Sequence, residues 1–230
     1  MVRIRRAFDE QLHALNERLV EMGAFVEAMV DNSIRALKEQ DVVLAQEVIA
    51  ADDTVDDMDL QIEQSCMTLL ALQQPMARDL RTIGTIMKVI ADVERIGDYA
   101  VDIARTAITL ADSEFFKPLV DIPRMAELVA AMLRKVIQAL VKRDLDLVTE
   151  VIAEDDEVDN MWYSLLDELT VMMQERSEIV PQAVALLLVA RYLERIADHT
   201  VNVAERVAYM ETGQLCDLAP SHRTKTESDS

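Results

Sequence analysis

The chain carries the same two sequence blocks twice, about a hundred residues apart. Residues 48–58 read VIAADDTVDDM and residues 151–161 read VIAEDDEVDNM, an offset of 103 residues. Residues 93–104 read VERIGDYAVDIA and residues 193–204 read LERIADHTVNVA, an offset of 100 residues. Each copy is long enough to bury a core of its own, so the repeat predicts one duplicated domain rather than a solenoid of short units.

Apolar residues recur at alternating steps of three and four positions, as in helices that pack at a shallow angle. The clearest run is formed by Leu12, Leu15, Leu19, Met22, Val26 and Met29. The chain has only four glycines, five prolines and 4% aromatic residues, too few for the turns and strands of a β-sandwich or barrel. We therefore expect an all-α protein with six long helices.

Helix-breaking residues set the boundaries within the first copy. The first helix is expected to fade at residues 38–40, and Asp41 is suited to cap a second helix that runs to Leu72. Gln74-Pro75 ends this helix, and Pro75 is expected in the first turn of a third helix, which ends near Ala111. Three long helices with short connections predict antiparallel neighbours.

These breaks divide the chain into four parts. Residues 1–112 are expected to form a first antiparallel three-helix bundle, and residues 124–212 a second. Residues 113–123 contain Pro118 and Pro123 and are expected to link the two bundles. Residues 213–230 lack apolar periodicity, which predicts a disordered polar tail.

The chain is strongly acidic, with 23 Lys and Arg against 43 Asp and Glu and a net charge of −20. This balance disfavours direct binding to nucleic acid or to an anionic bilayer, and it leaves metal cations and basic protein surfaces as partners. The two cysteines suggest no disulfide framework, and neither a signal peptide nor a membrane-spanning apolar run is evident. We expect a cytoplasmic protein.

Acidic or amide side chains recur every four residues on the third helix of each copy. They are Glu94, Asp98 and Asp102 in the first copy and Glu194, Asp198 and Asn202 in the second. Side chains four residues apart share a helix face and lie about 6 Å apart along its axis. Each row could therefore offer oxygen ligands to more than one cation, or to one cation completed by a neighbouring helix.

The second helix of each copy can supply the opposing acids. Folding the second helix back on the third brings Asp52 and Asp56 alongside Glu94 and Asp98. The same fold in the second copy places Asp155 near Asp198, and Asp159 near Arg195. Crowded carboxylates must be neutralised by protons, arginines or cations, so Arg95, Arg105 and Arg195 could instead tie these rows into ordinary salt bridges. If metals bind, all-oxygen ligands favour Mg, Ca, Mn or ferric iron over zinc.

The sequence resembles the PhoU family of bacterial phosphate-regulation proteins across about residues 5–210. The resemblance is carried by Gln73-Gln74-Pro75, by Asp79-Leu80-Arg81 and by the paired segments 94–98 and 194–198. The second copy departs from the pattern, because Ile179-Val180-Pro181-Gln182 lacks the Asp-Leu-Arg of the first and Asn202 stands where Asp102 does.

The resemblance implies two three-helix bundles side by side and, in some members, multinuclear iron or other metal clusters on the acidic faces. The ligands it implies here are Glu94, Asp98, Asp102, Glu194, Asp198 and Asn202, with Asp52, Asp56, Asp155 and Asp159 from the second helices. It further implies a negative regulator of the phosphate-starvation response. Such a regulator connects the ATPase subunit of the phosphate ABC transporter to a phosphate-sensing histidine kinase.

The leading hypothesis is therefore a non-enzymatic adaptor. We expect it to be a homodimer and to reach the membrane only through its partners. Two alternatives remain open from the residues alone. One is a metal-dependent helical enzyme, such as a di-iron oxidase or a phosphohydrolase, and the other is a purely structural helical adaptor.

Overall fold

The computed structural model describes residues 2–73, 75–214 and 218. Within this part of the chain it contains six α-helices and one short 3₁₀ turn, Ser177–Ile179. The helices are α1 Val2–Glu39, α2 Val42–Gln73, α3 Ala77–Leu110, α4 Asp121–Lys142, α5 Leu145–Glu175 and α6 Val180–Thr212. The all-α architecture with six helices, predicted from the repeat and the apolar spacing, is confirmed.

Corresponding aspartates begin the second helix of each copy. Asp41 Oδ1 accepts hydrogen bonds from the backbone N–H groups of Val43 and Leu44, so its predicted capping role is confirmed. Asp144 Oδ1 does the same for Asp146 and Leu147. The residue before each cap, Gln40 or Arg143, has a φ of 55° or 57°, which turns the chain sharply between helices.

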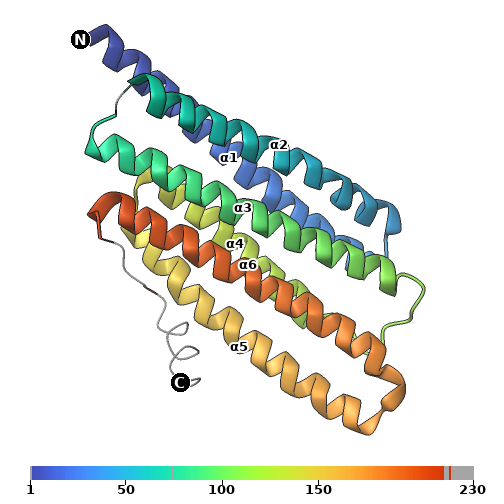
Figure 1. Cartoon of the computed structure of the whole chain (residues 1–230). Coiled ribbons are helices and arrows are strands. Elements are labelled where there is room, and N and C mark those ends of the chain that lie inside the picture. Colours follow the sequence, from blue (N-terminus) through green and yellow to red (C-terminus); the bar gives the residue numbers. More distant parts are fainter. Residues whose placement is uncertain (1, 74, 215–217, 219–230) are drawn as a thin grey trace, which may run out of the picture.

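Helices α3 and α6 lie side by side along the middle of the molecule, with α2 on the outer side of α3 and α5 on the outer side of α6 (Figure 1). The two central helices run antiparallel. Arg78 at the start of α3 pairs with Glu211 at the end of α6, at 3.6 Å. At the opposite end Gln182 of α6 accepts a hydrogen bond from the backbone N–H of Phe116.

The two bundles share a continuous hydrophobic core instead of meeting only at a linker. Helix α1 packs on α4 as well as on α2 and α3, and α4 packs on α5 and α6. At the α1–α4 contact, Gly23 allows Ile137 to approach the α1 backbone closely. The second copy is therefore placed on the first by apolar packing along two helix pairs.

Some predicted boundaries shift in the structure. Helix α4 begins at Asp121, so residues 121–123 of the predicted linker are helical, because a proline is tolerated in the first turn where its missing N–H has no partner to lose. Pro75 precedes α3, whose N-terminal cap is Met76, and so lies outside the first turn. In the predicted disordered tail, residues 215–217 and 219–230 lie outside the described residues. Leu218 is described, and its backbone N–H donates to Glu205 Oε1.

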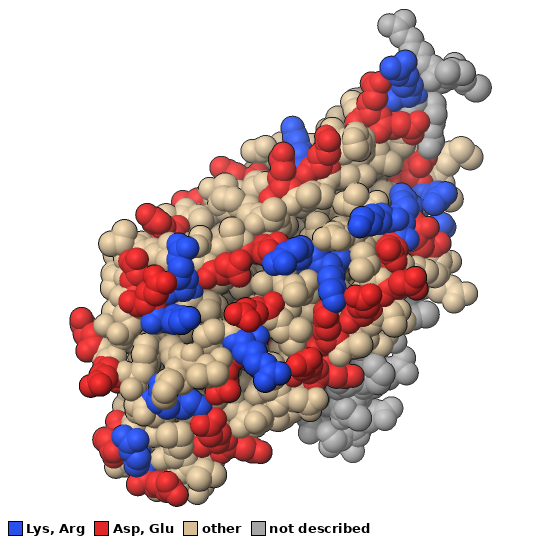
Figure 2. All heavy atoms as spheres, turned by 180° about the vertical axis from the view of Figure 1, so that it is seen from behind, with Lys and Arg blue, Asp and Glu red and all other residues tan. Residues whose placement is uncertain are grey.

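Acidic and basic side chains are mixed on the face of the molecule that is turned away in Figure 1. Figure 2 shows Asp and Glu side chains interspersed with Lys and Arg over that face. None of the described helices is both long and apolar enough to cross a membrane.

Candidate functional site

The structure brings acidic side chains of α2 and α3 together in the first copy. We call this group the first acidic face, and it comprises Asp52, Asp56, Asp59, Glu94 and Asp98. Burial, and then repulsion from Asp98, raises the pKa of both Asp52 and Glu94. Asp56 raises the pKa of the same two groups. These mutual effects require the carboxylates of the two helices to lie close together, as the back-folding of the helices predicts.

Asp59 is the residue of this face whose bonding is least complete. Its Oδ1 atom is buried and has no hydrogen-bond partner among the described residues. Burial, followed by repulsion from Glu63 and Asp56, raises the pKa of this carboxyl. A buried carboxylate oxygen without a donor is costly, and a proton or a cation would relieve that cost.

Two exposed arginines pair with the acidic row of α3. Arg95 Nη1 donates to Asp98 Oδ2 at 2.7 Å, and its Nε lies 3.6 Å from Glu94 Oε2. Arg105 Nη1 donates to Asp102 Oδ1 at 3.0 Å. The salt bridges expected from the sequence are therefore present. Arg105 also acts on Asp52 and partly offsets the rise in its pKa, but Asp52, Asp56 and Asp59 form no direct ion pair with an arginine among the described residues.

The second copy buries its acids more deeply. We call Asp155, Asp159, Glu194 and Asp198 the second acidic face. The Glu194 side chain is only 1% exposed, against 27% for Glu94, and it is hydrogen-bonded to Arg191. Asp198 Oδ2 accepts from Arg195 Nη1 at 3.1 Å, and Asp155 is 2% exposed. The acids of α6 are thus paired with arginines of their own helix.

Two replacements between the copies account for this difference. Arg191 occupies the position of Ala91 in the first copy, and Trp162 occupies the position of Asp59. The Arg191 guanidinium lies 5.8 Å from the centroid of the Trp162 ring, where a cation is favoured over the π face. The second face has therefore gained one positive charge and lost one negative charge. Comparing the two copies at their fixed offsets would have exposed this difference from the sequence.

Asp102 and Asn202, the last members of the two rows, both lie close to side chains of the opposite central helix. Asn202 Nδ2 donates to Asp92 Oδ1 of α3 at 3.3 Å. Burial, and then repulsion from Asp102, raises the pKa of Tyr192 on α6. The reason is helical phase: each step of four residues turns about 40° past a full turn, so the third member of a row lies about 80° from the first.

The chemistry of the first acidic face fits a hard cation. It offers several carboxylate oxygens, burial and then repulsion from Asp98 raise the pKa of two of its acids, and Asp59 has an unsatisfied buried oxygen. No three His, Cys, Asp or Glu side chains of the described residues are already grouped as a metal site. Binding would therefore require side chains of this face to rotate. The second face fits a cation less well, because Arg191 and Arg195 already supply positive charge.

Fold and site together define a class: a duplicated helical-bundle protein that presents charged side chains along its helix faces. The model of the PhoU domain matches residues 19–107 and again residues 122–207, once for each copy. The chain belongs to the PhoU family, as its sequence motifs indicate. Members of this family are accessory and regulatory proteins, so the chain is not an enzyme and the metal-dependent enzyme alternative is set aside.

Relatives match over most of their length. A PhoU homologue of Clostridium acetobutylicum, named as a phosphate-specific transport system accessory protein, is 38% identical over 93% of this chain and 98% of its own. The Escherichia coli protein of that name is 33% identical over 90% of this chain and 86% of its own. The crystal structure of PhoU from Pseudomonas aeruginosa superposes with a TM-score of 0.87 at 35% identity, over 90% of this chain and 100% of that one. The phosphate transport system regulatory protein PhoU from Streptococcus pneumoniae superposes with a TM-score of 0.86 at 30% identity, over 92% of this chain and 100% of that one.

Proposed function

We propose that this chain is an accessory protein of a phosphate-specific transport system and regulates phosphate uptake. The observation that carries the proposal is that both copies match proteins of this name along nearly the whole chain, with the same six-helix arrangement. A partial match could reflect a shared bundle alone, whereas here the relation extends over both bundles and their junction.

We further propose that regulation is negative and works by docking. The partners are the ATPase subunit of the phosphate ABC transporter and a phosphate-sensing histidine kinase, met in the cytoplasm, and the docking species is a homodimer. A helical protein with long charged faces is suited to this role, because complementary charge steers and orients weak protein contacts. Association with the membrane is then indirect, through the transporter.

The first acidic face is proposed to hold a hard cation, iron or alternatively Mn, Mg or Ca, with zinc less favoured by its oxygen donors. Asp52, Asp56, Asp59, Glu94 and Asp98 would hold it, and the ion would supply positive charge where the carboxylates repel one another. The second acidic face is proposed to bind a cation more weakly, because Glu194 and Asp198 already form ion pairs with arginines.

Partner binding is tested by a pull-down of the full chain with the transporter ATPase and, separately, with the kinase. Retention of either one supports the proposal, and failure to retain both overturns the docking role. In a strain that lacks the endogenous regulator, expression of this chain should restore repression of a phosphate-starvation reporter in phosphate-rich medium. Unchanged reporter expression would contradict negative regulation.

Cation binding is tested by elemental analysis after purification without affinity-column metals or chelators. Asp98→Asn in the first face and Asp198→Asn in the second form a matched pair, since each aspartate accepts from an arginine three residues earlier. We expect Asp98→Asn to lower metal content more than Asp198→Asn. Metal-free wild-type protein, or equal loss in the two variants, would contradict the proposed site.

A further inference from the structure

A basic hollow lies between the start of α3 and the end of α6, away from both acidic faces. Its volume is about 450 Å³, and it is lined by Leu80, Arg81, Gly84, Thr85, Lys88, Arg206 and Tyr209. Three of these residues are cations and none is an acid. In a chain with 43 acidic residues, this concentration of positive charge focuses the local field on anions.

The three cations of the hollow have no counter-charge within the described part of the chain. Arg81, Lys88 and Arg206 form no ion pair or hydrogen bond with any residue that the structure describes. At the same end of the groove, by contrast, Arg78 and Arg143 both pair with Glu211. Like charges that share a hollow repel one another, so an anion that enters it lowers the electrostatic energy of the folded protein.

Two buried polar atoms of the lining also have no partner. Arg81 Nε and Thr85 Oγ1 are inaccessible to solvent and make no hydrogen bond with a described residue. Thr85 is 1% exposed. Hydroxyls elsewhere in these helices donate to the carbonyl four residues earlier, as Thr106 and Thr200 do. Buried polar groups without partners are rare, and here both belong to the wall of one hollow.

The duplication provides an internal comparison for this end of the groove. At the fixed offset of 100 residues, the counterparts of Arg81, Thr85, Lys88, Arg206 and Tyr209 are Pro181, Ala185, Leu188, Thr106 and Thr109. The equivalent positions at the other end of α3 and α6 therefore carry none of the three cations. The basic hollow is therefore specific to the end where α3 begins and α6 ends, and the duplicated fold alone does not produce it.

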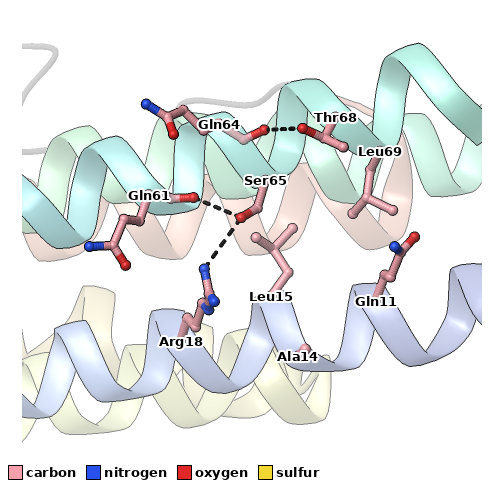
Figure 3. Close-up of a pocket in the computed structure, with 9 residues that line it drawn as sticks. All are labelled: Gln11, Ala14, Leu15, Arg18, Gln61, Gln64, Ser65, Thr68 and Leu69. Carbon is pink, nitrogen blue, oxygen red and sulfur yellow. Dashed lines mark hydrogen bonds between the residues drawn. The ribbon is translucent and has the colours of Figure 1, made fainter.

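The hollow between α1 and α2 gives a second comparison (Figure 3). Its only charged residue is Arg18, whose Nη1 donates to Ser65 Oγ, and the hydroxyls of Ser65 and Thr68 both donate to backbone carbonyls. That hollow is comparable in volume, about 390 Å³, but it has a single cation, and both of its hydroxyls donate to carbonyls. Volume alone therefore does not distinguish the α3–α6 hollow, whereas its three clustered cations and its two unsatisfied buried atoms do.

We propose that the hollow lined by Arg81, Thr85, Lys88 and Arg206 binds a phosphate group. Guanidinium groups present several donors to the oxygens of one oxyanion, and a lysine adds a point charge. Thr85 Oγ1 and Arg81 Nε gain the partners that they lack. The presence of an anion site follows from the lining itself, and the choice of phosphate among anions rests on the proposed function. Inorganic phosphate and a phosphomonoester share this chemistry.

The test is calorimetric titration of the full chain, stripped of metal by a chelator, with inorganic phosphate, with adenosine monophosphate and with sulfate at constant ionic strength. Binding of either phosphate compound supports the site, and the tighter of the two identifies the source of the phosphate group. Arg81→Gln and Arg206→Gln should each weaken binding by about tenfold to a hundredfold. Arg18→Gln in the α1–α2 hollow is the matched control and should not change binding.

Two variants separate ligand binding from folding. Gly84 lines the hollow, and no atom lies within 4 Å of where its Cβ would be, so the backbone has room for a side chain here and Gly84→Leu is expected to fill the hollow. It should abolish phosphate binding while the thermal midpoint stays the same or rises, because leucine favours helix over glycine. Thr85→Val should likewise weaken binding without loss of stability, since its hydroxyl has no partner to lose.

Absence of binding by both phosphate compounds overturns the proposal. So does binding that is unchanged in Gly84→Leu and Arg81→Gln, or that appears only when metal is added. The proposed function is contradicted by a different result. If the chain binds phosphate here but retains neither partner in the pull-down, the anion site is supported and the docking role is overturned. If the chain retains a partner but binds no phosphate, the docking role is supported and the anion site is overturned.

Discussion

Asp92 Oδ1 of α3 accepts a hydrogen bond from Nδ1 of His199 on α6, at 2.9 Å, across the seam where α3 and α6 pack and the two copies meet. The position of Asp92 in the second copy is held by Tyr192, and that of His199 in the first copy by Tyr99. Those two tyrosines stack with ring centroids 6.0 Å apart. One contact of the duplicated seam is thus polar, and its symmetry-related counterpart is aromatic.

Removing Asp92 should loosen the seam. Asp92→Ala deprives His199 and Asn202, both half-buried, of a shared acceptor. We expect the free energy of unfolding to fall by about 1–3 kcal/mol, the cost of leaving such groups unsatisfied. Urea denaturation measures this change. Asp156→Ala, at an exposed position on α5, is the control, and equal effects of the two substitutions would contradict a structural role for Asp92.

In protein stripped of metal, neutralising Glu94 should raise the free energy of unfolding at neutral pH. Burial and repulsion from Asp98 raise the pKa of Glu94, so the folded chain binds more protons than the unfolded chain between the two pKa values. The free energy of unfolding therefore falls as pH rises through that interval, and the penalty is fully present above it. Glu94→Gln should gain less than about 1 kcal/mol at pH 7, since the site is partly screened by solvent.

The gain from Glu94→Gln should disappear as pH falls below 4.5, the ordinary value for this side chain. Urea denaturation of wild type and variant at pH 7 and again near pH 4 measures both limits. A gain that persists at the lower pH would show that something other than ionisation is responsible.

The same substitution in the second copy should have the opposite sign. Glu194 is buried and hydrogen-bonded to Arg191, so Glu194→Gln removes the counter-charge of a half-buried arginine. We expect a loss of about 1–3 kcal/mol in the free energy of unfolding. Paired urea denaturation of Glu94→Gln and Glu194→Gln at pH 7 measures the contrast. If both variants shift in the same direction, the two faces do not differ as described.

Two glycines give another pair of opposite effects. A Cβ on Gly23 would lie 2.9 Å from Ile137 Cγ1, whereas a Cβ on Gly84 meets nothing within 4 Å. Gly23→Ala should cost about 1–3 kcal/mol through overpacking between α1 and α4. Gly84→Ala should stabilise the protein by up to about 1 kcal/mol through helix propensity. Thermal denaturation distinguishes them, and stabilisation of both would contradict the close α1–α4 contact.

Cys66 should be inert until the protein unfolds. Burial, and then repulsion from Glu63, raises the pKa of this thiol to about 12, so almost no thiolate is present at pH 8. In a Cys216→Ser background, reaction with a thiol reagent should require unfolding and should accelerate with urea in parallel with it. Rapid stoichiometric labelling of the native protein would contradict the burial of Cys66.

Much of this fold follows from local patterns. The apolar spacing predicts the helices, Asp41 predicts a cap, and the repeated blocks predict that the first three helices are followed by three equivalent ones. The meeting of Asp52 with Asp98 is also predictable, because two helices joined by a short turn must run back along each other. All of these features depend on residues that are near in sequence or on one short connection.

Contacts between the copies were decided by the tertiary structure. No local pattern places Asp92 against His199 or gathers Arg81, Lys88 and Arg206 around one hollow, because these residues meet only where α3 and α6 pack antiparallel. The positions of Asp102 and Asn202 also depend on this packing. Each row of acids turns slowly around its helix, and its third member meets the opposite central helix only once α3 and α6 have packed together. Short-range chemistry thus determines which helices form and how each bundle closes, while the long-range fit of one apolar seam determines which charged side chains face one another.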